Sequence, residues 1–150
     1  MLINRNLIML DAEFDSKDDA IEKIAKLFES EGYLNDLAGY IQAVKQRELE
    51  ISTNLGDGIG MPHARSNTVK KAGLVFVRLK NPIQWDGDNS PISVIFGIAV
   101  PESGGNLHLK LLAQLARNLI YDEFKEKIFK IENKDALLEL IKEATKGVNE

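Results

Sequence analysis

Apolar residues recur along the chain at the spacing of a helix, and this pattern predicts where the first two helices lie. Ser16, followed three positions later by Asp19, resembles a capping box, and apolar residues then recur every three or four positions up to Gly32. A second run with the same period extends to about Arg47, and Asn35 can cap its first turn. The pattern predicts two amphipathic helices, the second of which delivers Arg47 to a loop.

The strands are predicted from apolar runs that do not alternate with polar residues. The runs 74–79 and 92–100 are almost unbroken, which is typical of strands covered on both faces, and a short apolar opening at 7–10 predicts another strand. The remaining helices are expected at 107–119, 122–131 and 134–145, with Asn106 and Asn133 as N-caps. Because no repeat or linker composition interrupts the sequence, we expect residues 1–150 to form a single domain. Its predicted fold is α/β or α+β, a mixed sheet with helices on both faces.

One segment, 52–68, matches neither pattern. It carries Gly56, Gly58, Gly60 and Pro62 among small polar residues, a composition that favours irregular backbone over long regular elements. Functional residues are often found on such loops, so this segment is the first place to search for chemistry.

Charge and composition exclude several classes of partner and site. The chain has 150 residues, with 19 Lys and Arg against 23 Asp and Glu, a net charge of −4. A nucleic-acid reader usually has a basic surplus, so DNA and RNA are not expected partners. The absence of cysteine excludes disulfides and a cysteine nucleophile and fits a reducing compartment. No apolar run approaches the roughly 20 residues that span a bilayer, and the N-terminus lacks a signal-peptide pattern. We therefore expect a cytoplasmic protein without direct membrane insertion.

The two histidines of the chain both lie where chemistry is readily hosted. His63 follows Pro62 in the glycine-rich segment, where another molecule can approach the backbone closely; the alternative is a surface histidine without a role. His108 lies in the first turn of a predicted helix and points the same way as Leu112 and Leu115, toward the protein. It is either a core histidine bonded to a backbone carbonyl or a neutral ring that donates to a phosphoryl oxygen near the helix N-terminus.

Three further polar residues could bind an anion near these histidines. Arg47 is either a solvated charge at a helix end or a bidentate clamp for a phosphoryl group. Ser52 and Thr53 have hydroxyls that could donate to a phosphate, or that could serve turn and capping hydrogen bonds. The residue types alone leave both alternatives open for each of the three.

Other classes of site lack their sequence patterns. With two histidines, no cysteine and no HExxH motif, a zinc site is not expected. The P-loop motif GxxxxGK[ST] is absent, and GDGIGMP lacks the strand, GxGxxG, helix order of a dinucleotide fold. Composition permits a Ser/His/Asp hydrolase, but no GxSxG elbow occurs.

A resemblance to a known family rests on two stretches, RELEISTNLGDGIGMPHARSNTVKKA and PIQWDGDNSPISVIFGIAVPESGGNLHLKLLAQLARNL. They are similar to the fructose/mannitol-type enzyme IIA family of the bacterial phosphoenolpyruvate sugar phosphotransferase system. The most specific element is the G-x-x-x-P-H signature at residues 58–63, and the similarity extends over nearly the whole chain. The resemblance implies the enzyme IIA fold in a stand-alone subunit.

The same resemblance implies roles for individual residues. It implies that His63 is the phosphorylated nucleophile, that His108 is the second active-site histidine, and that Arg47 steadies the phosphoryl group, with Thr53 as a further phosphate contact. It also implies protein partners and no cofactor. The donor would be the phosphohistidine of the carrier protein HPr, and the acceptor a cysteine of enzyme IIB, which works with the membrane enzyme IIC in sugar transport.

Two alternative functions remain open at this point. The first is a regulatory enzyme IIA of the nitrogen-related branch, which would keep His63 but act by phosphorylation-dependent binding of target proteins. Trp85 in the PIQWDG turn favours the fructose type over that branch. The second is an interaction domain of the same fold without phosphoryl chemistry, against which the presence of both histidines argues.

A carrier of this kind needs a docking surface near its nucleophile. Ile59 and Met61 are the apolar residues closest to His63 in the sequence, and we expect Met61 at an exposed rim around it. For Ile59, packing in the core is an equal alternative.

Overall fold

The computed structural model describes residues 1–87 and 90–148. The helices are α1 (Lys17–Ser30), α2 (Leu37–Glu50), α3 (Leu107–Asn118), α4 (Asp122–Lys130) and α5 (Lys134–Ala144), with short 3-10 turns η1 (Arg5–Leu7) and η2 (Glu102–Gly104). The strands are β1 (Ile8–Ala12), β2 (Asn54–Gly56), β3 (Ile59–Gly60), β4 (His63–Ser66), β5 (Gly73–Ile83) and β6 (Ile92–Pro101).

The sheet is mixed and is organised around β6. Its strand order is β1-β5-β6-β3-β2, and β4 also pairs with β6. β5 runs antiparallel to β6, whereas β1 is parallel to β5. On the other edge of β6, β3 and β4 lie one after the other and both parallel to it, with Ile59 opposite Val94 and His63 opposite Ile98. His63 therefore stands beside the carboxyl half of the central strand.

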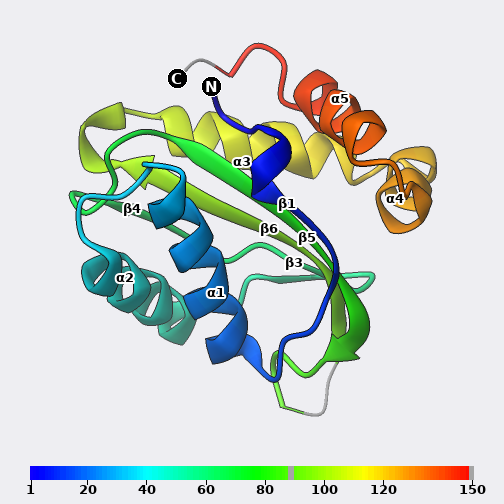
Figure 1. The fold of residues 1–150 in the computed structure, drawn as a ribbon, viewed down its shortest axis with the longest axis horizontal. Coiled ribbons are helices and arrows are strands. Elements are labelled where there is room, and N and C mark those ends of the chain that lie inside the picture. The colour runs from blue at the N-terminus through cyan, green and yellow to red at the C-terminus, as the bar shows by residue number, and fades with distance from the viewer. Residues whose placement is uncertain (88–89, 149–150) are drawn as a thin grey trace.

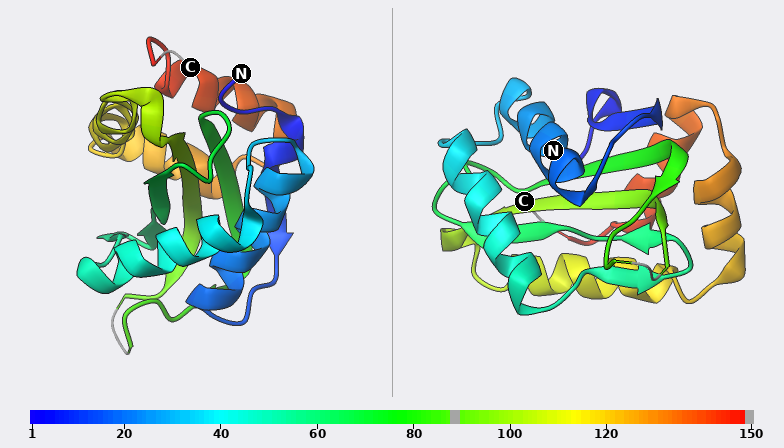
Figure 2. Two further views of the ribbon diagram at one scale, coloured as in Figure 1. Left: turned by 90° about the vertical axis from the view of Figure 1, so that its left-hand side faces the viewer. Right: turned by 90° about the horizontal axis from the view of Figure 1, so that it is seen from below.

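Helices cover both faces of this sheet, as predicted. Figures 1 and 2 show α1 and α2 on one face and α3 on the other, with α4 and α5 following α3. Between these layers the central residues of β5 and β6, 74–77 and 94–96, are fully buried, and the rings of Phe76 and Phe96 meet with centroids 5.4 Å apart. Burial of such a side chain contributes about 1.5–3 kcal/mol, so the unbroken apolar runs of β5 and β6 are explained by their position between two helical layers.

Capping residues set the helix starts, and one predicted cap is wrong. Ser16 and Asn133 accept from the backbone N–H groups of residues 19 and 136 at 3.1 and 3.0 Å, which confirms both predictions. For α2 the N-cap is Asp36 and not Asn35, because the Asp36 carboxylate accepts from Gly39 N at 3.0 Å. Asn106 occupies the N-cap position of α3, but its side chain makes no capping bond within the described chain.

The prediction of irregular backbone over 52–68 is wrong in part, because this segment contains β2, β3 and β4. These strands have three, two and four residues, too few to show a strand period in the sequence. β3 and β4 form because the edge of β6 offers them backbone partners, and β2 in turn pairs with β3. Asp57 and Gly58, with φ of 56° and 78°, make the tight turn between β2 and β3.

None of the helices among the described residues is long and apolar enough to cross a membrane.

Candidate functional site

Three segments that are distant in sequence meet at one cleft, which we call the histidine cleft. Its volume is about 380 Å³. The end of α2, the first residues of β4 and the first turn of α3 line it, through Ala43, Gln46, Arg47, Glu50, His63, Ala64, Arg65 and His108. The structure thus brings together three of the four predicted site residues: Arg47, His63 and His108. The fourth, Thr53, is not part of the lining.

A hydrogen bond assigns the tautomer of the His63 ring. Nδ1 of His63 lies 2.8 Å from the carbonyl oxygen of Met61, and a carbonyl can only accept. Nδ1 therefore carries the proton, and Nε2 keeps its lone pair. The next residue along, Pro62, is itself fixed, because its carbonyl accepts from Ile98 N of β6 at 3.0 Å. In the neutral ring the proton is therefore on Nδ1, and Nε2 is the unprotonated nitrogen.

The surroundings of His63 also favour the neutral ring. Burial lowers the pKa of His63 below its ordinary value of 6.5, because a charged ring loses its hydration there. The positive charge of Arg47 and the neighbouring His108 lower this pKa further, while the Met61 carbonyl and the Glu48 carboxylate oppose the shift. At neutral pH the ring is unprotonated at Nε2 and can act as a nucleophile.

His108 presents a buried nitrogen without a partner. The residue is half-buried in the first turn of α3, and its Nδ1 makes no hydrogen bond to any residue the structure describes. Nδ1 of His108 is therefore not bonded to a backbone carbonyl of any described residue, as the alternative of a core histidine would require. Burial, and then the positive charge of Arg65, lower the pKa of His108. A neutral ring with an unsatisfied buried nitrogen is suited to a polar ligand in the cleft.

Two guanidinium groups line the histidine cleft. Arg47 donates from Nη1 to the Ile51 carbonyl at 3.2 Å, and Arg65 donates from Nη2 to the Glu102 carbonyl at 2.8 Å. Each bond uses one of the five N–H donors of a guanidinium, so both groups are anchored and can still bind an anion. Sequence reasoning missed Arg65. The signal was available, since Arg65 is two positions after His63 and alternate residues of a strand share a face.

Thr53 and Ser52 are engaged elsewhere. Thr53 is only 4% exposed, and its hydroxyl donates to the buried carboxylate of Glu48. Ser52 donates to Asp86 at 2.7 Å. Glu48 was not among the predicted residues, because a buried carboxylate has no distinctive pattern in a sequence.

The expectation that Met61 lies at an exposed rim is wrong. Met61 is 4% exposed and Ile59 is 2% exposed, so both side chains belong to the core. Ile59 is the first residue of β3, and Met61 directly follows the strand. Alternate residues of an extended chain share a face, so both side chains lie on the same, buried face. Leu49, Ile51 and Leu109 are the large apolar side chains exposed next to the residues of the histidine cleft.

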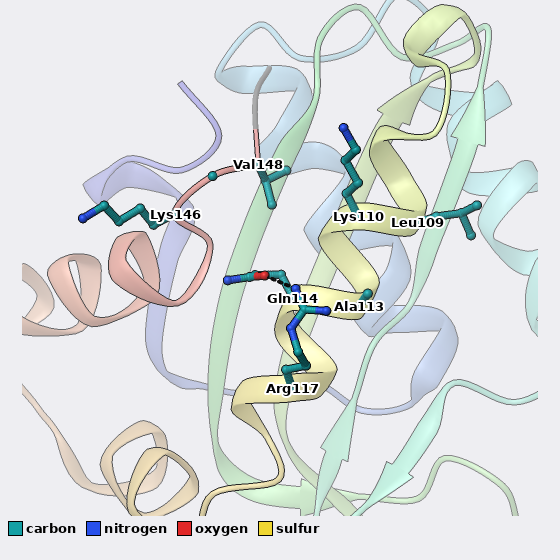
Figure 3. Close-up of a pocket in the computed structure, with 8 residues that line it drawn as sticks. Leu109, Lys110, Ala113, Gln114, Arg117, Lys146 and Val148 are labelled. Carbon is teal, nitrogen blue, oxygen red and sulfur yellow. Dashed lines mark hydrogen bonds between the residues drawn. The ribbon is translucent and has the colours of Figure 1, made fainter.

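A second cleft, which we call the C-terminal cleft, lies between α3 and residues 146–148 and has a volume of about 430 Å³. Lys110, Arg117 and Lys146 contribute its positive charges. Figure 3 shows Lys110 and Lys146 pointing away from each other, while Arg117 turns toward Gln114, to which it donates. These side chains do not converge on a common point. Among the described residues, no group of three His, Cys, Asp or Glu side chains could hold a metal ion.

The fold is that of the enzyme IIA proteins. The crystal structure of IIA mannitol from Escherichia coli superimposes with a TM-score of 0.80 at 24% identity, covering 94% of this chain and 99% of the other. The nitrogen regulatory protein IIA-Ntr from Neisseria meningitidis superimposes with a TM-score of 0.83 at 31% identity, covering 92% and 94%.

The sequence comparison then defines the family. Residues 1–144 match the family model described as the phosphoenolpyruvate-dependent sugar phosphotransferase system, EIIA 2. The chain belongs to this family, and it is an EIIA-type phosphotransferase component of the fructose/mannitol kind.

The chain is similar both to a separate EIIA component and to part of a longer EIIABC component. The fructose-specific EIIA component of Haloferax volcanii is 34% identical, over 91% of this chain and 90% of that protein. The fructose-specific EIIABC component of Bacillus subtilis is 30% identical over 97% of this chain, but the match spans only 23% of that longer protein.

Proposed function

We propose that the chain is a cytoplasmic phosphoryl carrier of one domain, residues 1–150, in which Nε2 of His63 accepts a phosphoryl group from phosphorylated HPr and passes it to a cysteine of enzyme IIB. Together with the membrane enzyme IIC, this transfer would serve uptake of a fructose- or mannitol-like sugar. The observation that carries the proposal is the bond from Nδ1 to the Met61 carbonyl, because in the neutral ring it makes Nε2 the free nitrogen, in a cleft with two guanidinium groups.

The transfer balances without a cofactor. The Nε2 lone pair attacks the phosphorus of the donor phosphohistidine, the new P–N bond forms, and the electron pair of the old P–N bond returns to the donor ring. Nδ1 of His63 keeps its proton on the Met61 carbonyl throughout. In the second step a thiolate of the acceptor attacks the same phosphorus, and the electron pair returns to Nε2.

The histidine cleft supplies electrostatic stabilisation for this step. Negative charge spreads over the three equatorial oxygens during phosphoryl transfer. Arg47, Arg65 and a neutral His108 line the same cleft as the nucleophile, and their N–H groups can donate to these oxygens. Thr53 could reach a phosphate only after releasing Glu48, so we propose a supporting role for it and not direct contact.

Exposed apolar residues around the histidine cleft support protein partners. Leu49 is 81% exposed and Ile51 63%, and both are adjacent in sequence to Glu50, which lines the cleft. Exposed apolar side chains near charged groups are typical of transient docking surfaces. A solved complex of IIA mannitol with phosphorylated IIB mannitol from Escherichia coli, whose IIA fold this chain shares, agrees with an enzyme IIB as the acceptor.

Reconstitution tests the proposal. The chain is incubated with phosphoenolpyruvate, enzyme I and HPr, and its intact mass is measured before and after addition of a fructose-type enzyme IIB. We expect one acid-labile phosphoryl group that is lost to the enzyme IIB cysteine on mixing. A chain that gains no mass from phosphorylated HPr would overturn the proposal.

The similarity to IIA-Ntr of Neisseria meningitidis favours one second candidate, a regulatory carrier that is phosphorylated but acts by binding target proteins. The same experiment separates the two, because a regulatory carrier would gain the phosphoryl group and keep it in the presence of enzyme IIB.

A further inference from the structure

A buried carboxylate lies directly behind the histidine cleft. Glu48 follows Arg47 in α2, but its side chain is only 4% exposed. A carboxylate is tolerated in such a place only when it is paired and hydrogen-bonded. The proposed phosphoryl transfer does not use Glu48, so its burial needs another explanation.

Glu48 holds one residue of the following loop by two bonds. The hydroxyl of Thr53 donates to Oε2 of Glu48, and the backbone N–H of Thr53 donates to Oε1 at 3.4 Å. Lys17, at the start of α1, supplies the compensating charge at 3.3 Å from Oε1. The position of Thr53 is thereby fixed through both its side chain and its backbone.

From Thr53 a chain of hydrogen bonds continues to the nucleophile. The Thr53 carbonyl accepts from the backbone N–H of Met61 at 3.0 Å. The Met61 carbonyl, on the same residue, accepts the proton of His63 Nδ1 at 2.8 Å. The carbonyl that selects the tautomer of the His63 ring is therefore itself held by a residue that Glu48 holds.

We propose that Glu48 is a positioning residue for the nucleophile. Through Thr53 it fixes the Met61 carbonyl, and that carbonyl keeps the proton of His63 on Nδ1 and leaves Nε2 free to attack. The proposal rests on the proposed phosphoryl transfer and adds to it a residue that touches neither phosphate nor partner.

The charge of Glu48, like its hydrogen bonds, favours nucleophilic attack by Nε2 of His63. Burial lowers the pKa of His63, and the Glu48 carboxylate opposes that shift. A more basic ring nitrogen is a better nucleophile, so the carboxylate offsets part of what burial and Arg47 remove. Glu48→Gln removes the charge and keeps one of the two oxygens, so it can accept only one of the two bonds from Thr53 and should fall between the wild type and Glu48→Ala.

The test reads the tautomer of His63 directly in the unphosphorylated chain, by ¹⁵N NMR of labelled histidine. In Glu48→Ala we expect both ring tautomers to be populated and the rate of phosphoryl uptake from phosphorylated HPr to fall about 10²-fold, as for a misplaced reacting group. Thr53→Val removes the hydroxyl bond to Glu48 and keeps the backbone bond, so it should shift the tautomer in the same direction by a smaller amount, which keeps the test decisive if Glu48→Ala does not fold. Glu48→Gln should populate the second tautomer less than Glu48→Ala does, and should lower the rate less.

Lys45→Gln is the matched control. Lys45 lies on the same helix, three positions before Glu48, and its ion pair with Glu22 at 3.1 Å ties α2 to α1 without any bond to the loop. We expect the wild-type tautomer and rate. An unchanged tautomer in folded Glu48→Ala or in Thr53→Val would overturn the proposal, as would an equal shift in Lys45→Gln. The tautomer is measured in the unphosphorylated chain. Failure of this proposal can therefore be distinguished from failure of the proposed phosphoryl transfer.

Discussion

The histidine cleft and the C-terminal cleft are similar in volume, at about 380 and 430 Å³, but differ in how their polar groups are held. In the histidine cleft the ring of His63 is oriented by a bond to a backbone carbonyl, and Arg47 and Arg65 are each anchored to another. In the C-terminal cleft the charged side chains of Lys110 and Lys146 are exposed and diverge (Figure 3). Volume alone therefore does not distinguish a site.

What distinguishes the histidine cleft is the combination of buried polar atoms with fixed neighbours. Holding a group in place before the reaction avoids reorganisation during it, and this is the main contribution of an active site to phosphoryl transfer. An exposed lysine in the other cleft must be ordered by any ligand that it binds, at an entropic cost. Substitutions in the two clefts test this contrast between held and unheld polar groups.

The largest effect is expected from His63→Ala. This change removes the nucleophile, so incubation with phosphoenolpyruvate, enzyme I and HPr should add no phosphoryl group. Intact-mass measurement checks the result, and circular dichroism verifies the fold. A folded variant that still gains a full phosphoryl group would place the acceptor elsewhere.

A smaller loss is expected from His108→Ala. The variant removes a donor and keeps the nucleophile, so phosphorylation should slow about 10²-fold, as for one lost oxyanion contact. Rapid-quench labelling measures the rate. Complete loss of labelling in a folded variant would instead indicate that His108 is an acceptor or a relay.

The pH dependence should report the lowered pKa values of both histidines. Each folded pKa lies below 6.5, mainly through burial, so uptake should be constant above that pH and fall as the pH drops through the folded pKa of His63. As the pH falls, the histidines of the unfolded chain bind protons near pH 6.5, whereas those of the folded chain do so only at a lower pH. The free energy of unfolding should therefore also decline as the pH falls below 6.5. A ¹⁵N NMR titration should place both midpoints below those of a denatured control, and a midpoint above 6.5 for His63 would contradict the assignment.

The smallest effect is expected in the C-terminal cleft. Arg117→Ala removes a guanidinium from that cleft, whereas Arg47→Ala removes one from the histidine cleft. We expect the first to change the rate of phosphoryl uptake by less than about twofold and the second to lower it about 10²-fold. Equal losses in the two variants would show that the contrast between the clefts is not functional.

Much of the fold could be predicted from local signals. The caps at Ser16 and Asn133 have side-chain oxygens in the right positions, and the runs that became β5 and β6 are long enough to show their burial. The strands between residues 54 and 66 could not be predicted, because two to four residues carry no period and because β3 and β4 pair with β6, some 35 positions later in the chain.

The site was predictable in its residues but not in its arrangement. His63 and His108 could be singled out from their loop and helix-start positions, whereas their meeting in one cleft depends on the parallel pairing of β4 with β6. Met61 was misplaced because the strands on either side of it, β3 and β4, are too short to be recognised from the sequence. Glu48 could not be found, since its importance lies in hydrogen bonds that only the folded loop creates.

The most direct test of the central claim is to identify the phosphorylated atom. Uniformly ¹⁵N-labelled chain is phosphorylated through HPr, and long-range proton–nitrogen correlation spectra of the histidine rings are recorded before and after transfer. The account predicts that the resonance of Nε2 of His63 shifts to the position of a phosphorylated nitrogen, while Nδ1 keeps its proton. Phosphorylation at Nδ1 of His63, or at His108, would contradict it.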